Sequence, residues 1–169
     1  MAEAEFISEL LLAMQEGIRA GNKQVIDKCY KDYDDAFPDR KTHEKRFRET
    51  VDIIGGISGG DLSRLKFRAT RLFYPLFCAV FHSKFGLPRL GVTRASFRGT
   101  DYPKLKMSLE GINELIDRIE TAKKANETLD LSAEERKFYD AYTVHWVHAD
   151  KRTVLTEFIS KQMVKALRD

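Results

Sequence analysis

The chain has few of the residues that commonly form cross-links or metal sites in small proteins. It contains two cysteines and four histidines in 169 residues, and neither type has the spacing of a metal-binding motif. Cys29 and Cys78 fall on the apolar sides of helical patterns, so we expect buried, reduced thiols. His145 and His148 could share one helix face, but a metal site needs a third ligand. The sequence therefore predicts no metal and no cofactor.

The chain also lacks a hydrophobic run of membrane-spanning length and a secretory leader. The longest apolar run, residues 72–81, is bounded by Arg71 and His82, whereas a transmembrane helix needs about 20 apolar residues. Two glutamates precede the first apolar run, where a signal peptide would carry positive charge. We therefore expect a protein without membrane contact, located in the cytoplasm.

No group of residues typical of a catalytic or nucleotide-binding site is present. The glycine-rich segment Gly55–Gly60 lacks the preceding strand and the following Lys-Ser/Thr of a phosphate-binding loop. Cys78 and His82 lie within the most apolar stretch, which favours a packed thiol over a reactive Cys–His pair. The aspartates of residues 27–35 lack the glycine and terminal glutamate of a calcium loop. We predict that this chain alone is not an enzyme.

What the sequence does contain is helical periodicity over most of its length, with only four prolines. This pattern predicts an all-α fold, a single-domain bundle of six to seven helices over residues 1–169. Apolar residues at helical spacing and end signals predict helices over residues 3–20, 23–35, 39–54, 65–84 and 103–125, with two more beginning at residues 132 and 150. The segment 89–101 is expected to be an exposed loop or to contain a short extended piece at residues 91–95.

The most informative stretch is the predicted helix over residues 65–84. Its core, residues 72–81, is apolar on almost every side, which indicates a helix surrounded by protein. Phe73, Phe77 and Phe81 recur every four residues and should stack on one face at the centre of the fold. Pro75 removes a backbone donor and should kink the helix near Arg71.

Positive charge is concentrated on both sides of this helix. Residues 62–98 contain eight Lys and Arg and no Asp or Glu, although the whole chain carries only +3. Because phosphate contacts are made mainly by Arg and Lys, seven of these residues are candidate nucleic-acid contacts. They are Arg64, Lys66, Arg68, Arg71, Arg89, Arg94 and Arg98. The alternative is a solvated surface, or pairing with acids elsewhere, because the rest of the chain is net acidic.

Several stretches together resemble one protein family. The sequences EFISELLLAMQEGI, YKDYDDAFP, FRETVDIIGGI, RLFYPLFCAVFHSKFGLP and ERKFYDAYTVHWVHADKRTVLTEFISKQMVKAL occur in this order. They resemble the helical region that follows the catalytic domain in GmrSD-like proteins, the ParB/sulfiredoxin-fold nucleases of modification-dependent restriction and phage defence. The resemblance covers most of the chain and lies in its packing patterns.

The resemblance implies a part of a larger protein without its chemistry. The family's catalytic P-x-x-Q-R-x-Y/F-x-W-like and D-G-Q-Q-R-L-like motifs are absent here, so no catalytic residue carries over. The implied role is a non-catalytic C-terminal accessory domain of a DNA-targeting nuclease, with Lys151 and Arg152 as further DNA contacts. The implied partners are DNA backbone, the catalytic domain of the parent protein and a second copy of the chain. The alternative is a free-standing helical protein–protein interaction module whose basic ends meet an acidic partner.

Overall fold

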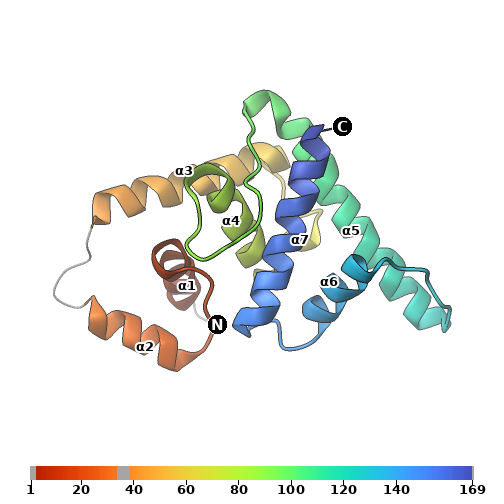
Figure 1. The fold of residues 1–169 in the computed structure, drawn as a ribbon, viewed down its shortest axis with the longest axis horizontal. Coiled ribbons are helices and arrows are strands. Elements are labelled where there is room, and N and C mark those ends of the chain that lie inside the picture. The colour runs from red at the N-terminus through yellow and green to blue at the C-terminus, as the bar shows by residue number, and fades with distance from the viewer. Residues whose placement is uncertain (1–2, 34–38, 169) are drawn as a thin grey trace.

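The computed structural model describes residues 3–33 and 39–168, and within these ranges it contains only helices and connecting segments (Figure 1). The predicted all-α fold in one unit is confirmed. The α-helices are α1 (Glu3–Glu16), α2 (Lys23–Asp32), α3 (Arg40–Ser58), α4 (Thr70–Phe85), α5 (Tyr102–Ala125), α6 (Ala133–Thr143) and α7 (Ala149–Arg168), and two 3-10 helices span Lys66–Arg68 and Gly99–Asp101.

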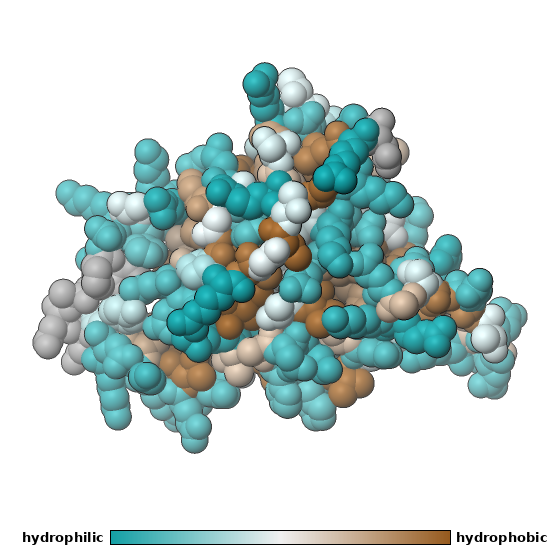
Figure 2. Space-filling view, viewed as in Figure 1, coloured by the Kyte–Doolittle hydropathy of each residue, from teal (hydrophilic) through white to brown (hydrophobic). Residues whose placement is uncertain are grey.

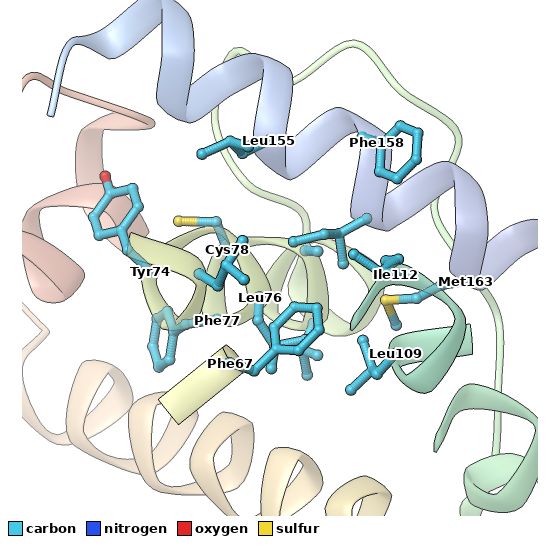
Figure 3. Close-up of a cluster of buried hydrophobic side chains, with 14 of the residues drawn as sticks. Phe67, Tyr74, Leu76, Phe77, Cys78, Leu109, Ile112, Leu155, Phe158 and Met163 are labelled. Atoms are coloured by element: carbon cyan, nitrogen blue, oxygen red, sulfur yellow. The ribbon is translucent and has the colours of Figure 1, made fainter. Parts of the chain in front are cut away.

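Helix α4 is the centre of the fold, as its apolar pattern predicts. It packs against α7, α3 and α1, and every residue from Tyr74 to Ser83 is buried. Figure 3 shows its side chains among those of α5 and α7. Phe77 and Phe81 are 0% and 2% exposed, and their rings stack with centroids 6.3 Å apart. Phe73 is only partly buried and contacts Phe6 of α1, so it lies at the edge of the core.

The predicted helix over residues 65–84 begins later than its sequence pattern indicates. Residues 66–68 form a 3-10 turn, Ala69 is extended, and α4 begins at Thr70. The cause is a tertiary contact: the backbone N–H of Lys66 donates a hydrogen bond of 2.8 Å to the side-chain Oδ1 of Asn113 in α5. Pro75 is therefore the sixth residue of α4. Its missing N–H deprives the carbonyl of Arg71, in the first turn of α4, of its α-helical hydrogen bond, instead of interrupting the middle of a longer helix.

Two other helix ends differ from the prediction, and in both a glycine contacts a distant segment. Helix α1 ends at Glu16 instead of residue 20, because Gly17 has φ +88° and a Cβ there would lie 2.5 Å from the Pro88 carbonyl oxygen. Helix α3 continues to Ser58 instead of ending at residue 54. A Cβ on Gly56 would lie 2.3 Å from the Tyr102 ring. Of the glycine-rich segment Gly55–Gly60, only Gly59 and Gly60 therefore lie outside α3.

The remaining helix predictions vary in accuracy. The start and end of α5 match, and α6 begins at the predicted place, after a capping box in which Ser132 and Glu135 are bonded reciprocally. Tyr30 of α2 is 54% exposed. Asp39 occupies the N-cap position of α3 without a side-chain bond. The predicted end of α2 near residues 34–38 lies outside the described residues.

No helix among residues 3–33 and 39–168 combines the length and the apolar character that crossing a bilayer requires.

We expect Phe77→Ala to lower the free energy of unfolding by about 3–5 kcal/mol, because it removes a fully buried ring and leaves a cavity beneath α3 and α4. Equilibrium denaturation measures this loss. Val51→Ala on the exposed face of α3 is the control and should change stability by less than about 0.5 kcal/mol. A loss below about 1 kcal/mol for Phe77→Ala would contradict the placement of this ring.

Candidate nucleic-acid interface

Of the four candidate basic residues that precede α4 or lie in its first turn, Lys66 lies against acidic side chains of α5. The Lys66 ammonium is 3.0 Å from a carboxylate oxygen of both Asp117 and Glu120. Hydrogen bonds to Asp117 and then Glu120 raise the pKa of Lys66 above its ordinary value. The positive charge of Lys66 is therefore already balanced by carboxylates within the fold. Arg68 is exposed and has no ion pair within the described residues.

The other two of these four residues also have partners within the fold. The Arg64 guanidinium is 3.2 Å from Asp61, in a pair that is largely exposed to water. The Arg71 guanidinium lies over the Tyr142 ring of α6, 4.9 Å from its centroid. An exposed ion pair of this kind is weak, so Arg64 could exchange Asp61 for a phosphate, whereas Arg71 is held by packing. Arg64 and Lys66 are thus paired with acids that lie outside residues 62–98, which is the alternative that the sequence leaves open.

The other candidates, within residues 89–98, lie in the loop between α4 and α5. His82, buried on α4, anchors this loop: its Nδ1 accepts the Leu87 N–H at 3.1 Å, and its Nε2 donates to the Val92 carbonyl at 2.9 Å. Arg94 donates to the Ser83 carbonyl at 3.2 Å, in the last turn of α4. A neutral imidazole therefore serves both loop bonds, and the loop is held in a defined position.

The three arginines of this loop are exposed. Arg89 adopts a positive φ of 62°, and Arg98 bonds through its backbone to Asp101 at the start of the second 3-10 helix. None of Arg89, Arg94 and Arg98 forms an ion pair with an acid in the described part of the chain. Figure 2, viewed as in Figure 1, shows hydrophilic side chains over most of the face that this loop crosses.

Helix α7 adds basic residues that the sequence analysis does not identify. Residues 91–93 and the C-terminal half of α7 together line a hollow of about 500 Å³, with Lys161, Lys165 and Arg168 on the α7 side. Lys161 is paired with Glu134 at 2.6 Å, whereas Lys165 and Arg168 have no ion pair within the described residues. In sequence they are typical basic residues of a helix C-terminus, so only the fold distinguishes them. We call the set Arg89, Arg94, Arg98, Lys165 and Arg168 the loop–α7 surface.

Lys151 lies apart from this surface. It contacts Asp150 at 3.3 Å and lines a hollow between α6 and α7 with Arg136 and Lys137. Lys151 and Lys165 are fourteen residues apart on one helix, which separates them by about 21 Å. The structure therefore does not bring Lys151 together with the loop arginines.

Arg152 is not a surface residue, which corrects its prediction as a DNA contact. Its side chain is 1% exposed and bonds to the carboxylate of Glu9 on α1 at 2.7 Å. It also donates to the Arg19 carbonyl at 3.1 Å. Its guanidinium lies 4.0 Å from the Tyr74 ring centroid and 5.3 Å from that of Trp146. Phosphate cannot reach this group.

The surroundings of this pair are tightly packed. A Cβ on Gly21 would lie 2.2 Å from the Arg152 guanidinium, so the chain passes the ion pair with a residue that has no side chain. Burial raises the pKa of the nearby Tyr74 phenol. Burial also raises the pKa of the Cys78 thiol to about 12, so Cys78 stays protonated and unreactive at neutral pH. The predicted packed thiol agrees with this placement.

The two histidines considered as metal ligands lie side by side. The rings of His145 and His148 stack with centroids 5.3 Å apart. Within residues 3–33 and 39–168, no group of three or more His, Cys, Asp or Glu side chains is arranged to hold a metal ion.

We expect Arg152→Met to lower the free energy of unfolding by about 3–5 kcal/mol, because it leaves the buried Glu9 carboxylate without its partner. The double variant Glu9→Leu with Arg152→Met should recover most of this loss, because both buried charges are then removed. Lys161→Ala breaks the exposed pair with Glu134 and serves as the control, with a loss below about 1 kcal/mol. Chemical denaturation of the four proteins tests this, and a double variant no more stable than Arg152→Met would contradict it.

Comparison with known proteins finds no match, whether with family models, with curated proteins or with solved structures. The resemblance to GmrSD-like nucleases therefore stays a prediction from the sequence, and the functional argument depends on the geometry of the loop–α7 surface.

Proposed function

We propose that this chain is a non-catalytic helical accessory domain that contacts the DNA backbone through the loop–α7 surface. The observation that carries the proposal is the hollow in which residues 91–93, flanked in sequence by Arg89 and Arg94, lie beside Lys165 and Arg168 of α7. These side chains have no ion pair within the described residues, so an external anion can neutralise them. The buried His82 holds the loop in position, which lowers the conformational cost of binding.

The chemistry of this surface favours phosphate over base recognition. Its members are arginines on a loop and Lys165 and Arg168 at the C-terminal end of α7, and arginine and lysine make many of the phosphate contacts of protein–DNA interfaces. Backbone contacts of this kind position a protein on DNA and give affinity that depends strongly on salt. We therefore expect weak binding without sequence preference.

The wider role follows from the family resemblance and belongs to the same proposal. In a GmrSD-like nuclease, this domain would hold DNA near a catalytic domain that carries the family motifs absent from residues 1–169. The partners would be the DNA backbone, that catalytic domain and a second copy of the chain. The location would be the cytoplasm, where the target DNA lies and where Cys29 and Cys78 stay reduced.

The second candidate is a free-standing protein–protein interaction module. It is favoured by the internal pairing of Lys66, which reduces the free positive charge, and by an open groove between α5 and α7. A salt titration separates the two candidates, because loss of counterions from DNA gives a characteristic slope.

We expect the chain to bind short duplex DNA at low salt, with log affinity falling linearly against log salt concentration. Arg89→Ala with Arg98→Ala should make the slope shallower by about 1.8, because each lost phosphate contact contributes about 0.9. Fluorescence anisotropy measures both quantities. Lys41→Ala with Lys45→Ala, on the exposed face of α3, is a control with the same loss of charge. Equal effects of the two double variants, or no binding at low salt, would refute the proposed surface.

We expect no nuclease or nucleotide-hydrolysing activity from these 169 residues, because the family's catalytic motifs are absent from the sequence. Incubation with modified DNA, unmodified DNA and nucleoside triphosphates tests this. Turnover that co-purifies with the protein and is abolished by a point mutation would show that the chain is an enzyme.

A further inference from the structure

Helices α5 and α7, together with Glu135 of α6, line an open groove. The groove has a volume of about 600 Å³ and is lined on the α5 side by Lys104, Met107, Gly111 and Glu114, among others. The resulting face runs along most of α5. It is separate from the loop–α7 surface except at Lys165, which lines both hollows.

Two features of this face are unfavourable for an isolated subunit. Met107 is 70% exposed, the highest value among the large hydrophobic residues of the described chain. Gly111 lies in the interior of α5, where glycine is less favourable than alanine. A Cβ at this position would meet no atom within 4 Å. Nothing within the subunit therefore requires glycine here, whereas the close approach of another chain would.

We propose that α5 of a second copy of this chain occupies the groove, antiparallel to α5 and related to it by a two-fold axis. Met107 and Gly111 are each two residues from position 109, and Lys104 and Glu114 are each five residues from it. One antiparallel register, centred at position 109, therefore places Met107 opposite the partner's Gly111. The same register places Lys104 opposite the partner's Glu114. Two-fold symmetry repeats each contact, so the face is complementary to itself.

The spacing of these residues is that of a helix–helix seam. Lys104 and Gly111 are seven residues apart, and Met107 and Glu114 are also seven residues apart. The second pair is shifted along the helix by three residues from the first. This is the heptad spacing by which side chains of one helix enter the spaces between side chains of another. Met107 would fill the space that Gly111 leaves open on the partner. The residues of α5 that line the groove extend from Lys104 to Arg118, about 21 Å along the helix axis.

Charge complementarity supports a second copy over other occupants. Lys104 and Glu114 are exposed, and neither forms an ion pair within the described part of the subunit. Across the two-fold axis, each would meet the opposite charge. An acidic or a basic peptide would instead be repelled by one of the two residues.

Charge reversal tests the register. The unmodified chain should dimerise in sedimentation velocity experiments as its concentration rises. Lys104→Glu alone and Glu114→Lys alone should each raise the dissociation constant of the dimer by roughly tenfold or more, because each places like charges opposite one another. The double variant Lys104→Glu with Glu114→Lys should restore dimerisation, since it exchanges both charges in every chain. Lys124→Glu, at the end of α5 and outside the groove, is the control and should leave the dimer unchanged.

Cross-linking gives a second measurement that does not depend on affinity. In a Cys29→Ser background, a mixture of Met107→Cys and Gly111→Cys chains should form a disulfide between chains faster than either chain alone. Circular dichroism verifies that each variant is folded. A chain that stays monomeric at all concentrations would overturn the proposal. So would a dimer that the charge reversals do not weaken, or equal cross-linking of the mixed and single chains.

This inference does not depend on the proposed DNA contact. Lys104 and Glu114 lie outside the loop–α7 surface, and Arg89→Ala with Arg98→Ala leaves the groove intact. The two proposals can therefore fail separately.

Discussion

The burial of α4 on all sides determines where the loop of the loop–α7 surface lies. Because α1, α3 and α7 each cover a part of this helix, the chain must leave it through a loop that crosses the bundle. His82 lies inside that cover and uses both ring nitrogens to hold the loop. Without the imidazole, the Val92 carbonyl would lose its bond to α4. A side chain of the buried core thus fixes the position of a loop that carries exposed arginines.

The Glu9–Arg152 pair performs a comparable task for the N-terminal helix. A buried ion pair contributes little net stability compared with apolar residues of the same shape, because both charges lose their hydration. Its effect is chiefly geometric: it fixes α1 and the Arg19 carbonyl against α7. The rings of Tyr74 and Trp146 add cation–π contacts around the guanidinium. The same group therefore cannot serve as an external contact.

The sequence predicts the existence of the helices well and their ends less well. Periodicity reports that a face is buried, but the ends of α1 and α3 depend on contacts of Gly17 with Pro88 and of Gly56 with Tyr102. Local signals suffice where the cap is local, as at Ser132.

Whether a basic residue is paired within the fold is harder to predict, since nothing in the sequence distinguishes Arg152 from Arg89. Glu9, the partner of Arg152, lies 143 residues away. The acids that neutralise Lys66 likewise come from α5, so only the fold separates paired from unpaired cations. In the same way, Lys165 becomes a candidate contact only because α7 lies beside the loop.

The two proposals have a joint consequence for affinity. One loop–α7 surface offers five cations, which is few for tight binding at physiological salt. A dimer joined through α5 would carry two such surfaces on one rigid body. If both surfaces can reach the same duplex, the second contact forms at a high effective concentration and strengthens binding without any new residue. Since Lys165 lines both hollows, dimerisation would also bring the partner's α5 close to this lysine. A weakly basic domain could therefore hold DNA firmly only as an assembly, and its DNA affinity should then rise with the fraction of dimer.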